Sequence, residues 1–310
     1  MTRLLFAARA HRWAEYGEVL PAALRDAGIA AEIATLDDPF DPAEIEWIVY
    51  APNSGLDDFR PYTALKGVLN LWAGVEDVEG NRTLTVPLTR MVEPGLTRGM
   101  VEYVTGHVLR HHLGMDTHIA GAAWDDTPPP LAADRPVAML GMGELGAACA
   151  GALAGLGFPV TGWSRSPKDM PGVRSVTGAA GLREALTGAA ITVLLTPLTR
   201  STENLMDAAR LSWLPNGAVL INPGRGALVD DAALLAALDR NLAHATLDTF
   251  RQEPLPDDHP FRAHPRITIT PHIASATRPE TAAKVIAENV RRGEAGEPLL
   301  HVVDRREALG

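Results

Sequence analysis

The sequence has few of the features that mark several classes of protein. Cys149 is its only cysteine, so the chain can form no internal disulfide and no metal site built from several cysteines. No apolar run is long enough to span a bilayer. The first apolar stretch is interrupted by Arg9 and is too short for a secretory signal. These absences lead us to expect a reduced, cytoplasmic setting and no membrane partner.

Positive charge is also scarce. The 28 Lys and Arg residues are outnumbered by 38 Asp and Glu residues, which gives a formal net charge of -10. Such a chain is not expected to offer a general surface for nucleic acid or for an anionic membrane. A small anionic ligand must therefore be held by local positive groups.

The sequence does contain a repeated alternation of short apolar runs and helical patterns. From about residue 137, apolar runs predict strands at 137–140, 160–163, 191–195, 218–222, 245–248 and 267–270. Leu145, Cys149, Leu153 and Leu156 show helical spacing between the first two runs, and Cys149 is expected to pack there rather than react. Apolar strands separated by helices predict a parallel sheet covered on both faces.

The first hundred residues repeat this rhythm more weakly, in LLFAA, AEIAT, WIVY and GVLNL, and predict a second, smaller α/β unit. The proline-rich segment 124–136 can be neither helix nor central strand, so it connects the two units or wraps one of them. Near the end, Thr277 with Glu280 three positions later predicts a helix that starts with a capping box.

A glycine-rich loop follows the strand predicted at 137–140. Gly141, Gly143 and Gly146 form a GxGxxG pattern that opens an Ala-rich helix. The first glycine permits a tight turn, the second lets a pyrophosphate approach the backbone, and the third lets helix and strand pack closely. The helix N-terminus then offers N–H groups to the phosphates. The loop predicts a dinucleotide site, with a glycine turn that binds no ligand as the alternative.

The end of the next predicted strand indicates which dinucleotide is bound. An NAD site usually places a carboxylate there, but this chain has Ser164, Arg165 and Ser166. A guanidinium flanked by hydroxyl groups suits a 2′-phosphate. NADP is therefore favoured and NAD stays possible, the alternative being that Arg165 is a solvated surface charge.

Three later predicted strands are each followed by a residue that can carry chemistry. Arg225 follows 218–222, Glu253 follows 245–248, and His272 follows 267–270. Each has an ordinary structural reading: a surface cation, a turn carboxylate, and a histidine satisfied by backbone. Ligands of open parallel sheets bind beyond the carboxyl ends of the strands, so the three together form a candidate catalytic group.

The segments that hold these residues resemble a known family. NPGRGALVD, LDTFRQEPLP and PHIASAT, downstream of GMGELG, resemble the D-isomer-specific 2-hydroxyacid dehydrogenases. WSRSPK and GEPLLHVVD resemble the glyoxylate/hydroxypyruvate reductase A branch of that family. The resemblance runs from about residue 65 to the end of the chain.

The resemblance implies two Rossmann-like parallel-sheet domains. A doubly wound dinucleotide-binding domain, residues 100–274, is implied to be inserted into a smaller flavodoxin-like substrate domain, residues 1–99 and 275–310. It also implies a homodimer to which the predicted helix from about Val101 contributes. The histidines of this helix region, at positions 107, 111, 112 and 118, lack the pattern of a metal site and are expected on an exposed or subunit-contacting face.

The implied activity is the reduction of glyoxylate and hydroxypyruvate by NADPH. Arg225 would bind the carboxylate of the 2-oxo acid and polarise its carbonyl group. His272 would donate the proton, and Glu253 would stabilise and orient the charged imidazole. Alternatives are a related dehydrogenase with a different 2-oxo acid and a nucleotide-sensing scaffold without turnover.

Further contacts are implied by the resemblance alone. WAGVED implies that backbone N–H groups around Gly74 and Val75 share the substrate carboxylate, and Asp248 is implied to bind the nicotinamide amide unless it is only a turn residue. Trp72, Pro223 and Gly224 depart from the usual family residues and affect the expected pocket shape. The remaining implied cofactor contacts come from the glycine loop and from strand ends: Glu144, Leu145, Leu195, Pro197, Pro223, Gly224, His272 and Ala274.

Overall fold

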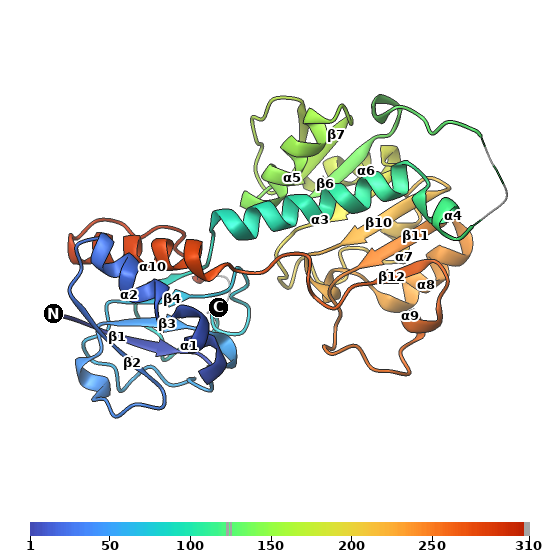
Figure 1. Ribbon diagram of the computed structural model, residues 1–310. Helices are drawn as coiled ribbons and strands as arrows, with labels where there is room; N and C mark the ends of the chain where they lie inside the picture. The colour runs from blue at the N-terminus through green and yellow to red at the C-terminus, as the bar shows by residue number, and fades with distance from the viewer. Residues whose placement is uncertain (122–123, 125, 307–310) are drawn as a thin grey trace. The chain divides into compact units, whose positions relative to one another are not determined.

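The computed structural model describes residues 1–121, 124 and 126–306 (Figure 1). It divides into two compact units. The smaller unit comprises Met1–Leu96 and Thr277–Gly310, and the larger unit comprises Thr97–Ala276. The chain therefore passes between the units near residues 96 and 276, a few residues from the domain boundaries predicted at 99 and 275.

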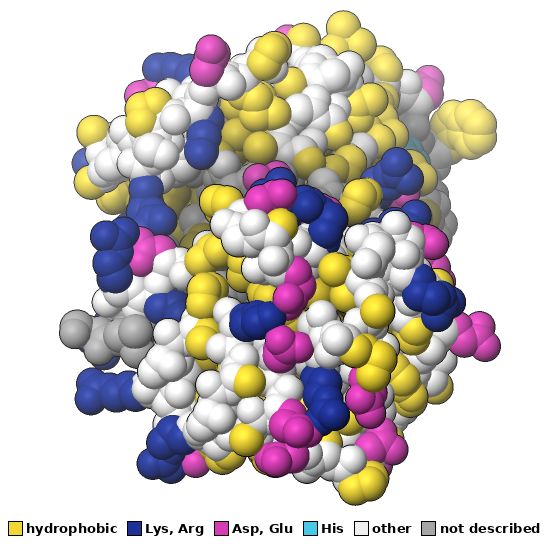
Figure 2. Space-filling view, turned by 90° about the vertical axis from the view of Figure 1, so that its left-hand side faces the viewer, with side chains coloured by type: hydrophobic (Ala, Val, Ile, Leu, Met, Phe, Trp, Pro, Cys, Tyr) yellow, Lys and Arg dark blue, Asp and Glu magenta, His cyan; other side chains and the backbone are white. Residues whose placement is uncertain are grey.

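The surface carries charges of both signs. On the face shown in Figure 2, Lys and Arg side chains lie interspersed with Asp and Glu side chains, and hydrophobic side chains lie among them. Within the described residues, no helix is both long enough and apolar enough to cross a membrane. An anionic ligand on such a mixed surface depends on local donors rather than on the overall field.

The larger unit contains a seven-stranded sheet in the order β12-β11-β10-β9-β6-β7-β8, and every pairing in it is parallel. With β6 numbered as the first strand, the order read from β8 begins 3-2-1-4-5-6, as in dinucleotide-binding folds. Its strands are β6 (Val137–Leu140), β7 (Val160–Ser164), β8 (Val173–Thr177), β9 (Ile191–Leu194), β10 (Ala218–Asn222), β11 (Leu242–Leu247) and β12 (Ile267–Ile269).

Helices cover both faces of this sheet (Figure 1). Val137 and Met139 pack against α3 (Pro94–His112) and α5 (Glu144–Gly155), whereas Ala138 and Leu140 pack with α6 (Gly178–Gly188) and α8 (Asp231–Arg240). Successive strand residues face opposite sides, so both sets bury apolar surface. The shorter helices are α4 (Met115–Ile119), α7 (Ala208–Leu211), α9 (Pro260–Ala263) and the 3-10 turns Ala132–Asp134 and Gly226–Leu228.

The structure bears on two expectations about this unit: it excludes one alternative for segment 124–136 and agrees with the packing role of Cys149. Segment 124–136 lies within the larger unit and leads into β6, so it does not connect the units; its residue 125 is outside the described residues. Cys149 is fully buried between α5 and the sheet, and burial raises the pKa of its thiol to about 12. The thiol is therefore a packing group, as expected.

The histidines of α3 do not form the exposed face that the sequence predicts. The His111 side chain is 5% exposed, and its Nε2 lies 2.9 Å from the Thr246 hydroxyl of β11. His112 is buried against Phe158. The expectation is wrong for both residues because the helix turns them toward its own unit, while His118, on α4, is exposed. Among the described residues, no group of three or more His, Cys, Asp or Glu side chains could hold a metal ion.

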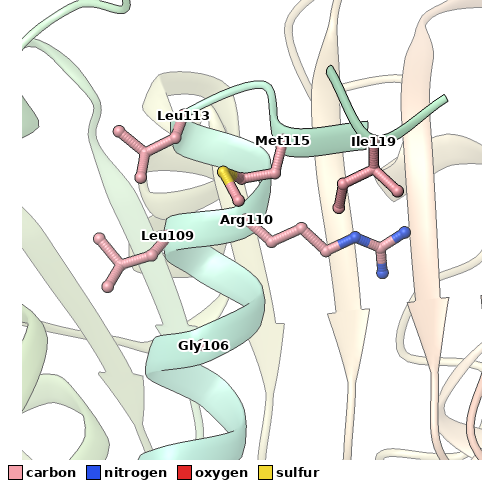
Figure 3. Close-up of a pocket in the computed structure, with 6 residues that line it drawn as sticks. All are labelled: Gly106, Leu109, Arg110, Leu113, Met115 and Ile119. Atoms are coloured by element: carbon pink, nitrogen blue, oxygen red, sulfur yellow. The ribbon is translucent and has the colours of Figure 1, made fainter. Parts of the chain in front are cut away.

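An apolar surface remains where α3 meets α4. Leu109, Leu113, Met115 and Ile119 line a pocket together with Gly106 and Arg110 (Figure 3). Leu113 is 39% exposed and Ile119 is 74% exposed. Large apolar side chains grouped at one exposed place often mark a contact with another protein.

The smaller unit contains a five-stranded sheet in the order β2-β1-β3-β4-β5, again with every pairing parallel. This is the flavodoxin-like order. Its strands are β1 (Thr2–Ala7), β2 (Ala31–Thr35), β3 (Trp47–Tyr50), β4 (Gly67–Asn70) and β5 (Leu88–Thr89). Helices α1 (Ala10–Tyr16), α2 (Val19–Asp26) and α10 (Pro279–Glu294) pack on one face (Figure 1), and 3-10 turns occur at Pro42–Glu44 and Pro52–Ser54.

Helix α10 does not begin with the predicted capping box. Its N-cap is Arg278, and the Thr277 hydroxyl donates to Leu71 O at 2.9 Å. Pro279 occupies the first turn, where a missing N–H is tolerated, and the Arg278 N–H donates to the Glu93 carboxylate at 3.1 Å. Glu93 is 2% exposed and also accepts from Gly95 N at the start of α3. One buried carboxylate therefore serves both helix starts.

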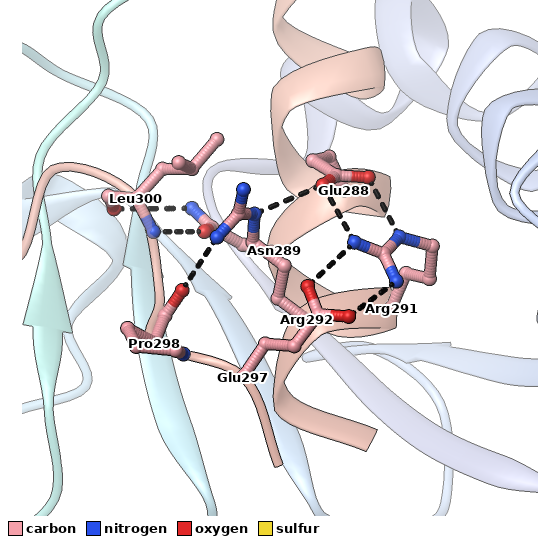
Figure 4. Close-up of polar contacts among 7 residues, drawn as sticks. All are labelled: Glu288, Asn289, Arg291, Arg292, Glu297, Pro298 and Leu300. Carbon is pink, nitrogen blue, oxygen red and sulfur yellow. Dashed lines mark hydrogen bonds and ion pairs between the residues drawn. The ribbon is translucent and has the colours of Figure 1, made fainter. Parts of the chain in front are cut away.

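The end of α10 is tied to the segment that follows it (Figure 4). Glu288 accepts hydrogen bonds from both Arg291 and Arg292, and Arg291 also reaches Glu297. These pairs are partly exposed and contribute little each. Asn289 is 2% exposed, and its Oδ1 accepts from Leu300 N at 2.7 Å. The buried Asn289 amide therefore stabilises the contact between α10 and the segment around Leu300 more than the exposed ion pairs do.

Candidate active site

The glycine loop after β6 has the geometry of a dinucleotide turn. Gly141 adopts a φ of +103°, and a Cβ there would overlap the backbone of Leu195 and Thr196. A Cβ at Gly146 would overlap the Gly141 carbonyl oxygen. Both positions therefore require glycine. A Cβ at Gly143 would instead meet no described atom within 4 Å, so this glycine faces open space beside the start of α5.

That open space fits a pyrophosphate. Gly143 is the N-cap of α5 and supplies no side chain to the helix start, and Glu144 and Leu145 form its first turn. The N–H groups and the positive end of the helix dipole at such a start suit phosphate oxygens. Leu195 lies under the turn, with its N–H donating to Leu140 O at 2.7 Å, and Pro197 follows on the exposed side.

The end of β7 carries no acidic group. Ser164 is its last residue, and its hydroxyl donates to Ser166 O at 2.7 Å, which closes a tight turn around Arg165. Arg165 and Ser166 are exposed. The guanidinium and the hydroxyl groups are therefore carried on a short, defined turn.

Arg225 lies on a turn that is organised by Asn222, the last residue of β10. Asn222 is 1% exposed; its amide donates to Arg225 O at 2.9 Å and accepts from Gly224 N at 3.2 Å. The Arg225 guanidinium donates to Gly224 O at 2.8 Å. Pro223 and Gly224 are buried, and a Cβ at Gly224 would lie 2.8 Å from Leu194 O. The glycine thus allows the turn to pass close to β9.

His272 and Glu253 are in direct contact. His272 Nδ1 lies 2.7 Å from Glu253 Oε2, and Glu253 Oε1 accepts from Phe250 N at 2.9 Å. The imidazole is half exposed. The carboxylate is fixed at both oxygens, so it can hold one imidazole nitrogen while the other stays available to a ligand.

Asp248 holds the loop on which His272 lies. Its carboxylate accepts from the Thr270 hydroxyl at 2.6 Å and from Ile273 N and Ala274 N, both at 2.9 Å. Asp248 is fully buried. His272 has a φ of +54°, an unusual value for a residue other than glycine, and its N–H donates to Asp248 O at 2.9 Å. The loop is therefore fixed in a sparsely populated backbone conformation.

Sequence reasoning missed several residues that organise this site. Arg251 donates to Val229 O at 2.6 Å and bonds Asn204 Oδ1, which joins the Glu253 turn to the segment after Arg225. The Tyr103 hydroxyl lies 2.7 Å from the Thr270 hydroxyl. These contacts join segments far apart in sequence, so no local pattern indicates them. Asn222 is the polar residue that ends the apolar run 218–222. Its position at the carboxyl end of a predicted strand could have marked it as a residue of the site.

The larger unit thus brings most of the predicted residues to one edge of its sheet. Strands β12, β11 and β10 are neighbours and parallel, so His272, Glu253 and Arg225 follow carboxyl ends on the same edge as the glycine loop. Gly74 and Val75 belong to the smaller unit, in the loop after β4, where Trp72 packs partly buried against the core. Fold and site define a dinucleotide-binding α/β protein with a carboxylate–imidazole pair.

The family follows from a direct match. Residues 104–274 match the model of the D-isomer specific 2-hydroxyacid dehydrogenase NAD binding domain, and the chain belongs to this family. A protein from Klebsiella pneumoniae named glyoxylate/hydroxypyruvate reductase A is 39% identical over 254 residues, which cover 78% of this chain and 81% of that protein. A protein of the same name from Serratia proteamaculans is 40% identical over 77% of this chain and 80% of its own length.

Solved structures of similar proteins support the same family. A D-isomer specific 2-hydroxyacid dehydrogenase from Xanthobacter autotrophicus, in complex with NADPH and MES, matches with a TM-score of 0.88, 39% identity and 99% coverage of both chains. The NADPH-dependent glyoxylate/hydroxypyruvate reductase from Sinorhizobium meliloti, in complex with NADP and sulfate, has a TM-score of 0.86 and 33% identity over 99% of this chain and 100% of its own. The predicted family, branch and fold class are confirmed.

Proposed function

We propose that the protein uses NADPH to reduce small 2-oxo acids, glyoxylate to glycolate and hydroxypyruvate to glycerate. The observation that carries the proposal is the 2.7 Å contact between His272 and Glu253 on the sheet edge that also holds the glycine loop. The names of the similar proteins point to the same substrates. Under this proposal, residues 100–274 are the dinucleotide-binding domain and residues 1–99 and 275–310 are the substrate domain.

The cofactor would be held by residues of the sheet edge. Gly143 and the first turn of α5 would take the pyrophosphate, and Arg165 with Ser164 and Ser166 would take the 2′-phosphate. When bound, NADPH supplies a hydride. NAD is a possible weaker alternative because the turn lacks a carboxylate for the ribose hydroxyls. The other proposed contacts are Gly141, Glu144, Leu145, Gly146, Leu195, Pro197, Pro223, Gly224, Asp248, His272 and Ala274.

The acid in this proposal is His272. Its Nδ1 faces Glu253, so Nε2 is the nitrogen that would donate a proton to the carbonyl oxygen of the substrate as the alkoxide develops. Glu253 would stabilise the positive imidazolium before that transfer and keep the ring oriented. The buried Asp248 would hold the loop in place throughout.

Arg225 would bind the substrate carboxylate. A guanidinium can donate two parallel hydrogen bonds to a carboxylate and can also polarise a neighbouring carbonyl group. Backbone N–H groups around Gly74 and Val75 would share the same carboxylate. These contacts would favour a 2-oxo acid over an aldehyde that has no carboxylate.

We also propose a cytoplasmic homodimer in which the apolar surface of α3 and α4 is covered by a second copy. The exposed Leu113 and Ile119 support this assignment (Figure 3). Ile119→Lys should then shift the mass measured by light scattering during gel filtration from dimer to monomer. A wild-type protein that elutes with the mass of one chain would contradict the dimer.

A substrate panel tests the function. Purified protein is mixed with NADPH or NADH and with glyoxylate, hydroxypyruvate, pyruvate or phenylpyruvate, and loss of the reduced cofactor is followed by absorbance. The proposal predicts the fastest turnover with NADPH and the first two acids. Preference for phenylpyruvate would indicate a different dehydrogenase of the family. Tight NADPH binding without any turnover would indicate a nucleotide-sensing scaffold.

A further inference from the structure

The loop after β4 is organised by one buried side chain, Asn70. It is the last residue of β4 and is 1% exposed. Its Nδ2 donates to Trp72 O at 3.0 Å and to Gly74 O at 2.7 Å. Both partners are carbonyl oxygens, which only accept, so the amide nitrogen must be the atom that faces them. The two carbonyl groups are therefore turned toward the same side chain.

The orientation of these carbonyls fixes two N–H groups. In a trans peptide, the C=O and N–H groups point in opposite directions. The cis bond found among the described residues is Glu253–Pro254, so the peptides that follow Trp72 and Gly74 are trans. With Trp72 O and Gly74 O directed at Asn70, the N–H groups of Ala73 and Val75 point away from it. Two donors thus face the same side of the loop.

Other contacts hold the loop in this orientation. Trp72 O also accepts from Met91 N at 2.9 Å, and Leu71 O accepts from the Thr277 hydroxyl at 2.9 Å. Trp72 packs against one core cluster of the smaller unit and Val75 against the other. In the part of the chain that the structure describes, neither Ala73 N nor Val75 N donates to a protein acceptor. The two N–H groups are therefore available for a ligand.

Asn70 is also unfavourable for the stability of the core in which it is buried. Its Oδ1 is buried without a hydrogen-bond partner among the described residues. An unsatisfied buried oxygen destabilises a fold, and residues of this kind occur where a site needs them. The carboxyl end of a parallel strand is the place where such sites form.

We propose that Asn70 is a positioning residue that directs the Ala73 and Val75 N–H groups toward the carboxylate of the 2-oxo acid. The inference rests on the proposed function and deepens it. It assigns the second donor to Ala73, while Gly74 contributes its carbonyl group to the bond with Asn70. Two N–H groups on one side of the loop suit a carboxylate, which is acceptor-only and has two oxygens that can accept from them.

The test measures ligand affinity as well as turnover. Oxamate, an unreactive analogue of a 2-oxo acid, is titrated calorimetrically into the protein saturated with NADPH. Asn70→Asp keeps the side-chain shape but cannot donate to the two carbonyls, and Asn70→Ser retains one donor. Asn81→Asp is the matched control, because Asn81 also holds a loop of the smaller unit, by donating to Asp57 O at 2.6 Å.

The proposal predicts that Asn70→Asp weakens oxamate binding and raises KM for glyoxylate by about 10- to 100-fold, the loss expected for hydrogen bonds to a charged group. NADPH affinity should stay within about twofold of wild type, because the glycine loop is unchanged. The oxamate affinity and the KM of Asn70→Ser should fall between those of wild type and Asn70→Asp. Both values for Asn81→Asp should match wild type. A purely structural role of Asn70 would lower Tm and leave oxamate affinity and KM unchanged.

Each contrary result has a separate meaning. Wild-type oxamate affinity in Asn70→Asp, or in Asn70→Ser should the first variant not fold, overturns the inference. A wild-type protein that does not bind oxamate also overturns it. A wild-type protein that binds oxamate but reduces no 2-oxo acid contradicts the proposed function and leaves the inference intact.

Discussion

Glu253 contacts His272 through one carboxylate oxygen, at 2.7 Å, and Phe250 N through the other, at 2.9 Å. Protein contacts alone therefore orient the Glu253 side chain. The imidazole is held in turn by a loop whose backbone is fixed on Asp248. Preorganisation of this kind reduces the rearrangement needed during proton transfer.

Glu253→Gln should lower kcat by about 10- to 100-fold, because a neutral amide gives no electrostatic stabilisation to an imidazolium. The KM for NADPH should change little. Steady-state kinetics with glyoxylate checks this, with Glu184→Gln on α6 as the control. Equal kcat in Glu253→Gln and wild type would show that the contact is structural only.

Asp248→Asn should destabilise the fold and slow the reaction together. An amide has one acceptor oxygen, so it cannot satisfy the three donors that now surround the buried carboxylate. The free energy of unfolding should fall by about 1–3 kcal/mol, the effect of an unsatisfied buried group. Urea unfolding measures it, and Asp239→Asn, at an exposed carboxylate, is the control. A selective loss of NADPH affinity without loss of stability would instead support the nicotinamide contact predicted for Asp248.

Arg165→Ala should weaken NADPH by about 10- to 100-fold and NADH hardly at all. The guanidinium would pair with the 2′-phosphate, which NADH lacks, and charge-assisted bonds of this kind account for such factors. Fluorescence titration of both cofactors checks this, with Arg174→Ala as a surface control. Equal losses for the two cofactors would contradict a 2′-phosphate contact.

Buried histidines predict a loss of stability in mild acid. Burial lowers the pKa of His111 to about 3, and it also lowers the pKa of His107 and of His244. An unfolded histidine takes up a proton below a pH of about 6.5, whereas folded His111 stays neutral down to about pH 3. The unfolded state therefore binds more protons in this window, and the free energy of unfolding falls as pH decreases through it.

For His111 the slope should reach about 1.4 kcal/mol per pH unit. Urea unfolding measures this slope at several pH values between roughly 7.5 and 4.5, a range that spans the ordinary histidine pKa of about 6.5. His111→Gln should flatten the dependence, and His118→Gln, at an exposed position, should not. An identical slope in wild type and His111→Gln would contradict the assignment.

Much of the larger sheet could be predicted because its central strands are buried on both faces and therefore read as apolar runs. The run at 218–222 became β10 with the same bounds. Strand β8 was missed because it lies at the sheet edge, where Arg174 is exposed and breaks the apolar pattern. Edge strands bury less surface and leave a weaker signal in sequence.

The site was predictable where charged or imidazole side chains follow strand ends and unpredictable where side chains act through hydrogen bonds to the backbone or to other segments. Glu253 and His272 were predicted from their strands, and the structure brings them into contact. Asn70 acts through two backbone carbonyls close to it in sequence, and Arg251 through Val229 and Asn204. Hydrogen bonds of this type have no periodicity, so only coordinates reveal them. The buried imidazole of His111 on α3 illustrates the same limit, since its partner Thr246 comes from β11.

The role of His272 as proton donor is tested by comparing wild type with His272→Gln in a single turnover of bound NADPH with glyoxylate. We expect the variant to bind NADPH within about twofold of wild type and to oxidise it about 10²- to 10⁴-fold more slowly, the range for loss of a general acid. Oxidation at the wild-type rate by His272→Gln would show that this imidazole does not donate the proton.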